Sequence, residues 1–363
     1  MKREWLGILV NDGLIEGIKK QQTGHEKLDF YLEAGNKYGF STCFFSLRDI
    51  SLKTNRVNAF IYSGGKWKQK KLPIPKVIHN RAIFQSKSNW QRSMKLVNSG
   101  VQLFNFWNRY GKMYIGRLLA SQPEFISHIP ETLPFTSQHV KEMMERFSSF
   151  LLKPNKGTVG EGIIKLDKVD EGVWKASYRS GKKMVQATIQ ENQLYSKLKK
   201  IAGNGEYFLQ ETIPLATYHG SPFDIRVSVQ KDGTGDWSIT GLMGKAARPG
   251  HFLSNVAQGG KVFKVEELLQ EYPQLSGEKV IHKINQLALS MVRFLSKSLP
   301  HLADVGFDFG IDEKGHPYFI EMNGRDQRYS FKKGGESAIW KLTYEKPVAY
   351  ARFLMDQQKG VQQ

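Results

Sequence analysis

The order of strand-like and helical segments constrains the fold of this sequence more than any other feature. In the first 105 residues, apolar runs of strand length occur at 6–10, 41–45, 59–62 and 77–79, and a helical pattern at 27–38 separates the first two. This order predicts a parallel α/β layer, because parallel strands need a crossover connection. We therefore expect a small Rossmann-like domain. It has no G-x-G-x-x-G sequence after its first strand, so no dinucleotide site is predicted.

The remaining sequence is rich in strands. Helices are predicted at 112–120, 136–147, 190–202, 278–298 and 337–355. Strands are predicted at 150–152, 162–166, 173–178, 184–189, 207–211, 225–230, 237–244, 305–311 and 318–321. Successive strands without a helix between them predict antiparallel sheet. The chain is therefore expected to be of the α/β (α+β) class.

Composition excludes several classes of protein. The 363 residues include one cysteine, Cys43, which excludes an internal disulfide and a thiolate metal cluster. No apolar stretch reaches the ~18 to 20 residues of a membrane span. The apolar run at the N-terminus is too short for a secretory signal. We expect a cytoplasmic protein without membrane insertion.

The charge balance is strongly basic. Lysine and arginine outnumber aspartate and glutamate by 53 to 34, a formal net charge of +19. Such a field attracts nucleic acid, nucleotides, acidic polymers or anionic surfaces. No helix-turn-helix, zinc finger or RNP-type motif accompanies the charge. A solvated basic face is therefore favoured, and nucleic-acid binding is the weakest alternative.

Two apolar runs near the end of the chain carry three oxygen-bearing side chains, here called the oxygen trio. Asp308 lies in the first run, a polar turn with Gly315 follows, and the second run ends with Glu321 and Asn323. The turn predicts a β-hairpin, and strand alternation places Glu321 and Asn323 on one face, which Asp308 can share. The alternative is a set of unrelated surface groups at strand ends. Convergence of three oxygens suits magnesium, which combines such ligands with water and phosphate oxygens.

A glycine-rich loop follows another predicted strand. Lys153 ends the strand, and the loop contains Lys156, Gly157, Gly160 and Gly162. Glycine lets the backbone approach phosphate closely and offer N–H donors, while Lys153 adds a point charge. The loop does not end in the Gly-Lys-Ser/Thr of a Walker A motif. Alone it is more simply a hairpin turn, but the oxygen trio downstream makes it a candidate phosphate cradle.

Taken in chain order, these segments resemble the ATP-grasp superfamily. Residues 150–154 and the glycine loop resemble its phosphate-clasping strand and lid, and residues 208–213 resemble the hinge that hydrogen-bonds adenine. Asp224-Ile225-Arg226 matches the Asp-x-Arg of ribosomal-modification-type ligases. Ser254-Asn255 with Gly259-Gly260 is similar to their Ser-Asn…Gly-Gly stretch.

The resemblance implies a set of site residues. The oxygen trio would bind magnesium, with manganese as an alternative. ATP contacts would come from Lys112, Lys153, Lys156, Gly157, Thr158, Gly160, Gly162, Gln210, Glu211, Ile213, Asp224 and Asn255. Arg226 would meet the charge that develops at the phosphates. Leu253 departs from the pattern, because close ligase relatives have a basic residue there; Lys245 or Arg248 would supply that charge.

The resemblance also implies the architecture, an ATP-grasp fold with an N-terminal Rossmann-like pre-ATP-grasp domain. The expected division is 1–105 for that domain, 106–205 for a small subdomain with the glycine-rich lid, 206–332 for a C-terminal subdomain with the metal site, and 333–363 for a C-terminal helix or tail.

More narrowly, the whole chain resembles the YheC/YheD family of endospore coat-associated ATP-grasp proteins. The segments that carry this resemblance are 6–9, 224–227, 253–260 and 304–308. It implies a role in spore formation, in the cytoplasm of the sporulating cell or at the spore coat. Coat proteins would then be partners.

The expected activity is that of an ATP- and magnesium-dependent ligase. A small-molecule or peptide carboxylate would attack the γ-phosphate of ATP to give an acylphosphate and ADP, and an amine or thiol would then displace phosphate. The alternative is a non-catalytic ATP-binding scaffold or interaction protein of the spore coat. Leu253 and the net charge of +19 favour that alternative.

Overall fold

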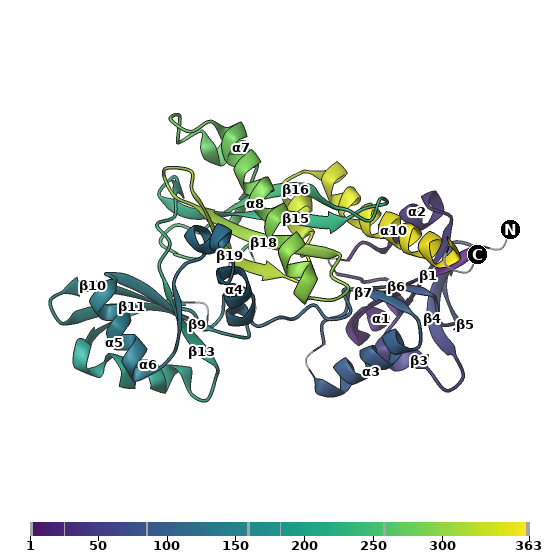
Figure 1. Cartoon of the computed structure of the whole chain (residues 1–363), viewed down its shortest axis with the longest axis horizontal. Helices are drawn as coiled ribbons and strands as arrows, with labels where there is room; N and C mark the ends of the chain where they lie inside the picture. The colour runs from purple at the N-terminus through teal and green to yellow at the C-terminus, as the bar shows by residue number, and fades with distance from the viewer. Residues whose placement is uncertain are drawn as a thin grey trace.

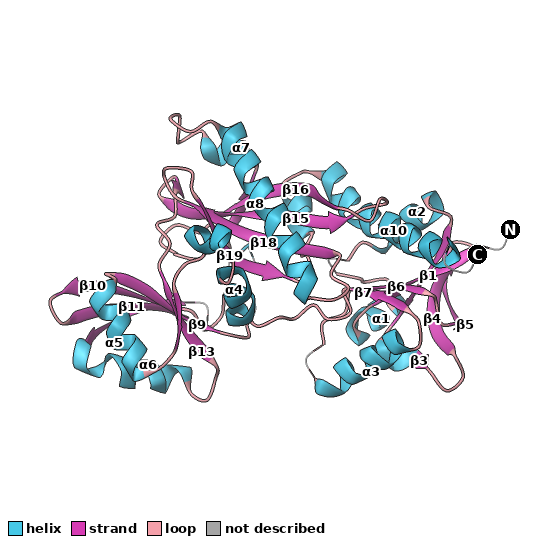
Figure 2. Ribbon diagram, in the orientation of Figure 1, coloured by secondary structure: helices cyan, strands magenta, loops and turns pink. Residues whose placement is uncertain are grey.

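Three β-sheets form the body of the computed structural model, which describes residues 3–24, 26–84, 86–157, 160–181, 183–256 and 259–360. The N-terminal sheet and a small sheet lie at opposite ends, with the central sheet between them (Figure 1). Helices and strands are both abundant (Figure 2), so the predicted α/β class is confirmed. In the described ranges, no helix combines the length and apolar character needed to span a bilayer.

The N-terminal sheet is Rossmann-like, as predicted. Its strands are β1 (Glu4–Leu9), β2 (Phe40–Phe45), β3 (Ile50–Ser51), β4 (Arg56–Ser63), β5 (Lys66–Pro73), β6 (Val77–Asn80) and β7 (Gln102–Phe104). The order is β3-β4-β2-β1-β6-β7, with β5 beside β4. Strand pairs β1–β2, β1–β6 and β6–β7 are parallel. Its helices are α1 (Asp12–Lys19), α2 (Leu28–Lys37), α3 (Lys87–Asn98) and the 3₁₀ helix Leu47–Asp49.

The small sheet is antiparallel throughout and runs β12-β11-β10-β9-β13-β8. Its strands are β8 (Thr132–Pro134), β9 (Ser149–Pro154), β10 (Ile164–Asp170), β11 (Val173–Ser180), β12 (Lys183–Gln190) and β13 (Tyr207–Glu211). Helices α5 (Ser137–Arg146) and α6 (Leu194–Ala202), the latter after a 3₁₀ turn at Glu191–Gln193, share its apolar core. The expected division places β13 in the segment 206–332, whereas its hydrogen bonds lie in this sheet.

The central sheet carries the predicted hairpin. Its strands are β14 (Thr217–Tyr218), β15 (Ser221–Lys231), β16 (Trp237–Ala246), β17 (Lys261–Phe263), β18 (Asp304–Ile311) and β19 (Pro317–Asn323). The order is β17-β16-β15-β18-β19, with β14 beside β15. Helix α8 (Gly277–Ser298) packs on β15 and β16, and α7 (Val265–Leu269) and α4 (Lys112–Ala120) contact α8. The 3₁₀ helix Pro123–His128 contacts α4 and β19.

Helix α10 (Ser337–Gly360), which follows α9 (Tyr329–Lys333), joins the N-terminal and central sheets. It contacts α2 and β6 of the first and β15 and β16 of the second. Nearby, the Asn105 side chain donates to the backbone oxygens of Asp304 and Gly324. The buried Asp304 carboxylate also pairs with Arg81 and Arg328. These contacts fix the loop after Asn105 against the end of β19, where the candidate site lies.

Candidate functional site

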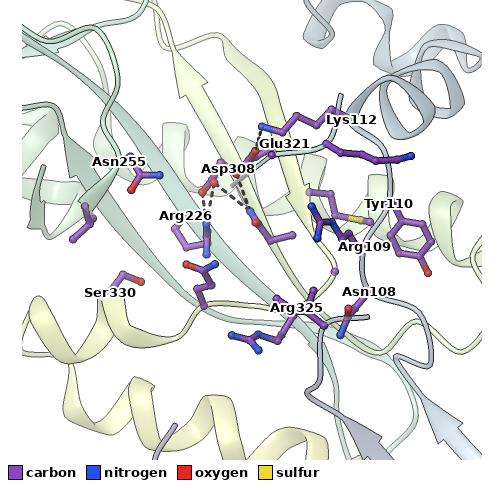
Figure 3. A pocket seen from close by; sticks show the side chains of 18 of the residues that line it. Asn108, Arg109, Tyr110, Lys112, Arg226, Asn255, Asp308, Glu321, Arg325 and Ser330 are labelled. Carbon is purple, nitrogen blue, oxygen red and sulfur yellow. Dashed lines mark hydrogen bonds and ion pairs between the residues drawn. The ribbon is translucent and has the colours of Figure 1, made fainter. Parts of the chain in front are cut away.

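A cavity lies where the central sheet, the loop before α4 and the turn after β9 meet (Figure 3). Its lining comes from Ile83 of the N-terminal domain, from residues 108–110, 112, 155–157 and 255–256, from residues between 321 and 330, and from Arg226, Lys245 and Asp308 on the sheet. Concave sites between domains are the usual places for small-molecule binding. The cavity contains the predicted oxygen trio.

The oxygen trio converges as predicted. Asp308 stands directly opposite Glu321 across β18 and β19, and Gly306 stands opposite Asn323. Alternation then places the three side chains on one face. The Asn323 amide nitrogen donates to Asp308 Oδ2 at 3.4 Å and to Glu321 Oε1 at 3.2 Å. The hairpin register therefore brings the three oxygen-bearing groups within hydrogen-bonding distance of each other.

Basic side chains on adjacent strands pair with these carboxylates. Arg226 Nε and Nη2 donate to the two Asp308 oxygens at 2.7 and 2.9 Å. Lys245 Nζ lies 2.9 Å from Asp308 Oδ1 and 2.7 Å from Asp224 Oδ1. Lys112 Nζ lies 2.7 Å from Glu321 Oε2. The register explains the pairing, because Arg226 is opposite Asp308 and Lys245 is opposite Asp224.

The paired cations keep the carboxylates of the trio ionised. Burial raises the pKa of Asp308, but the charges of Arg226 and Lys245 outweigh it and hold this pKa below its usual value. Burial likewise raises the pKa of Glu321, but the charge and the hydrogen bond of Lys112, together with the charge of Arg226, lower it below its usual value. Asp224 differs, because burial raises its pKa more than Lys245 lowers it.

The donor set of the trio fits magnesium. It comprises two carboxylates and one amide, whose nitrogen faces the carboxylates in this structure and whose oxygen would be the metal ligand. Magnesium characteristically takes one or two protein carboxylates together with water and phosphate oxygens. No group of three or more His, Cys, Asp or Glu side chains suited to a metal is found among the residues described. The residues therefore suit a metal that arrives with a phosphate ligand better than a metal held by protein alone.

Two of the predicted ATP contacts form a buried polar pair on the small sheet. Lys153 on β9 donates to the side-chain oxygen of Gln210 on β13, and the Gln210 amide donates to Thr132 Oγ1 at 3.0 Å. Burial, then the charge of Lys112, lowers the pKa of Lys153 to about 7. Lys153 is therefore a buried amine whose charged form is disfavoured, and it forms no ion pair with a carboxylate in the described part of the chain.

The other predicted residues occupy different places. Lys112, Lys156, Gly157 and Asn255 border the cavity, as do Arg226 and Lys245. Glu211 is on β13 and Ile213 follows it, while Gly160 and Gly162 have positive φ angles of 69° and 76°. Asp224 forms an ion pair with Lys245 and accepts a hydrogen bond from Ser254. Arg248 is exposed beyond β16 and does not border the cavity, and Thr158 lies outside the described residues.

The sequence patterns do not identify several polar residues that border the cavity. Asn108 and Arg109 lie in the loop before α4, and Arg325 follows Asn323 by two residues. Gly324 shows why the two segments meet, since a Cβ there would lie 2.6 Å from the backbone oxygen of Asn108. Proximity of Arg325 to Asn323 in the sequence was the only signal for these residues.

Comparisons with known proteins identify a family. A family model described as YheC/D-like ATP-grasp matches residues 100–354. The endospore coat-associated protein YheD of Bacillus subtilis (strain 168) is 23% identical over 328 residues, which are 86% of this chain and 71% of that protein. The endospore coat-associated protein YheC of the same strain is 24% identical over 344 residues, which are 90% and 92% of the two chains.

Solved structures show the same fold. D-cycloserine synthetase DcsG is similar with a TM-score of 0.54 at 11% identity, covering 94% of this chain and 98% of that one. The ATP-grasp ligase PsnB complexed with its minimal precursor gives a TM-score of 0.53 at 12% identity, covering 96% and 100%. The predicted ATP-grasp fold is therefore confirmed.

The lowered pKa of Lys153 predicts how Lys153→Met changes stability with pH. The pKa of Lys153 is about 7 in the folded protein and about 10.5 in the unfolded chain. Between about pH 7 and about pH 10.5 the unfolded state therefore binds more protons than the folded state. The parent protein loses stability as the pH falls through this range. Methionine removes this penalty. We expect the free energy of unfolding of Lys153→Met, measured with urea, to rise relative to that of the parent by an amount on the order of 3 kcal/mol as the pH is lowered from about 9.5 to about 6.5. A difference that does not change with pH would contradict the assignment.

Proposed function

Because this chain belongs to the YheC/D-like ATP-grasp family, we propose that it binds ATP with magnesium and joins a carboxylate to an amine or a thiol. The observation that carries the proposal is the cavity in which the oxygen trio meets Lys112, Arg226 and Lys245. Phosphoryl transfer depends mainly on positioning and on charge neutralisation. This cavity gathers groups suited to both.

The proposed reaction has two steps. A substrate carboxylate oxygen attacks the γ-phosphorus of ATP, the bond to the β-phosphate oxygen breaks, and ADP leaves. An amine or thiol then attacks the acyl carbon of the acylphosphate, loses a proton, and phosphate leaves. No step needs a covalent bond to the protein, which fits a cavity without a cysteine, serine–histidine or cysteine–histidine pair among its described lining residues.

Each group has a role in this proposal. Lys112, at the start of α4, and Lys153 hold phosphate oxygens, while Arg226 and Lys245 meet the charge that develops during transfer. The oxygen trio provides the metal ligands. When bound, magnesium or manganese neutralises charge between the phosphate oxygens. Asn255 and Asp224 contribute further polar contacts, and Gln210, Glu211 and Ile213 form the adenine-side hinge.

The segments of the chain divide this work. The small subdomain, 106–205, carries the lid at 156–162, which closes over the phosphates and excludes water that would hydrolyse the acylphosphate. The subdomain 206–332 carries the oxygen trio, and the domain 1–105 shapes the choice of substrate. The segment 333–363 docks the two sheets together through α10.

The biological setting is proposed from the relatives, which are described as endospore coat-associated. We place the ligase in the cytoplasm of a sporulating cell or at the spore coat, with coat proteins as partners. The second candidate is a non-catalytic ATP-binding scaffold of the coat, favoured by Leu253 and by the net charge of +19. Release of ADP by the purified protein separates the two candidates.

Substitutions in the oxygen trio should remove magnesium-dependent nucleotide binding. Glu321→Gln removes the negative charge and replaces one carboxylate oxygen by NH₂, and Asn323→Ala removes the amide; both leave the buried Arg226–Asp308 pair intact, so both should fold. We expect Mg–ATP binding, measured by calorimetry, to weaken at least tenfold in each and to be lost in Asp308→Ala. Glu313→Ala, an exposed acid in the turn of the same hairpin, is the matched control. If both mild variants bind Mg–ATP like the parent, the trio is not the metal site.

A second prediction concerns which basic residue supplies the charge that Leu253 lacks. Lys245 contacts Asp224 and Asp308 in the cavity, whereas Arg248 is exposed outside it. Lys245→Met should therefore reduce ADP formation at least a hundredfold, while Arg248→Ala should remain within about twofold of the parent. ADP release is measured with Mg–ATP and pooled amino acids, cell-wall fragments and acidic peptides. The opposite ranking would assign the cation to Arg248.

A further inference from the structure

The positive charge of the chain is concentrated in one long segment. Residues 50–123 contain 14 lysine and arginine residues and no aspartate or glutamate, whereas the other residues contain 39 basic and 34 acidic side chains. This segment therefore accounts for most of the net charge of +19. The proposed ligase function gives a role to one of its 14 basic residues, Lys112, so the rest of this charge is unexplained.

Strand β5 carries the densest part of this charge. Four of its eight residues are Lys66, Lys68, Lys70 and Lys71, and all four are exposed. None of them forms an ion pair with a carboxylate among the residues described. Because side chains alternate along a strand, Lys66, Lys68 and Lys70 lie on one face, roughly 7 Å from one to the next. Here they are called the lysine row.

The same strand is a free edge of the N-terminal sheet. It pairs along its whole length with β4, from Lys66 opposite Ser63 to Pro73 opposite Arg56, and with no other strand in the described ranges. Figure 1 draws β5 at the outer end of this domain, remote from the small sheet. An edge strand presents a row of backbone N–H and C=O groups that no neighbouring strand pairs. Strand β5 thus offers hydrogen-bonding groups and positive charge side by side.

Aromatic packing holds this edge in place. Trp67 lies on the opposite face of β5 from the lysine row. Its ring centroid is 5.5 Å from that of Phe44 and 5.3 Å from that of Tyr62, and Phe44 is fully buried. The strand is therefore fixed against the core before any partner arrives, which reduces the conformational entropy that binding would cost.

The free edge and the lysine row together restrict the chemistry of a partner. A second copy of β5 would place lysines opposite lysines, and like charges directly opposite each other destabilise a strand pair. A nucleic acid supplies phosphates for the lysines but no backbone that pairs with both N–H and C=O groups. An extended peptide pairs with both. If every second residue of that peptide is acidic, its carboxylates lie opposite the lysine row.

We propose that β5 binds an acidic peptide segment of a partner protein, which adds a strand to the N-terminal sheet and places carboxylates opposite Lys66, Lys68 and Lys70. The main-chain hydrogen bonds supply affinity, and the lysine row selects acids at alternating positions. No residue of β5 lines the cavity that contains the oxygen trio. The inference is therefore independent of the proposed ligase function.

Calorimetry of the full chain with synthetic octapeptides tests the proposal. The probe is a capped peptide of four Thr-Glu repeats, which should bind at least tenfold more tightly than the uncharged peptide of four Thr-Gln repeats. Two further probes are N-methylated at all threonines or at all glutamates, and each lacks the N–H groups along one edge. Because only one edge of the peptide faces β5, one methylated probe should bind at least tenfold more weakly and the other within about twofold of the parent peptide.

A triple variant tests the lysine row. Lys66→Gln/Lys68→Gln/Lys70→Gln should bind the Thr-Glu peptide about tenfold more weakly with an unchanged melting temperature, because these side chains are exposed. The control is Lys20→Gln/Lys87→Gln/Lys95→Gln, which removes the same charge from exposed lysines outside β5 and should bind within about twofold of the parent protein.

Three results would overturn the proposal: no binding of the Thr-Glu peptide, equal weakening in the two triple variants, or equal effects of the two N-methylated probes. The first result would leave the lysines only the role of preventing edge-to-edge aggregation. An oligothymidylate of eight nucleotides that binds more tightly than the peptide would overturn the assignment to a peptide partner.

Discussion

A layer of buried charge across three strands of the central sheet is the constraint on which the site depends. Arg226 on β15 stands opposite Asp308 on β18, and Asp224 on β15 stands opposite Lys245 on β16. Alternation places all four on one face, so each buried charge meets an opposite one. Removing one partner of such a pair costs about 3 to 5 kcal/mol. A shift in strand register would therefore both separate these charge pairs and move the candidate site residues off this face.

The same face also joins the domains. Asp304 lies four residues before Asp308 on β18, and its carboxylate pairs with Arg81 and Arg328. Asp326 links the two regions, because its carboxylate accepts hydrogen bonds from Arg226 and Ser228 and its backbone oxygen accepts one from Arg81. One strand thus carries the contact between domains and the candidate metal ligand. Because a single network includes both, the orientation of the N-terminal domain and the position of Asp308 depend on each other.

Local patterns in the sequence predicted most of the fold and the oxygen trio, because alternation and turn glycines act over a few residues. Strand β5 was not predicted, since its exposed lysines give no apolar alternation at the edge of a sheet. The choice between Lys245 and Arg248 needed the register of β15 and β16. Arg109 and Arg325 needed tertiary structure, because the close contact of Gly324 with Asn108 joins segments far apart in the sequence. The roles of all these residues in binding stay predictions.

The central claim is that the oxygen trio holds the metal of a bound nucleotide. Anomalous diffraction from crystals grown with manganese and a non-hydrolysable ATP analogue measures this directly. We predict a manganese peak within roughly 2.2 Å of oxygens from Asp308, Glu321 and Asn323, with the triphosphate on its other side. Nucleotide density with manganese bound away from these three side chains would contradict the claim.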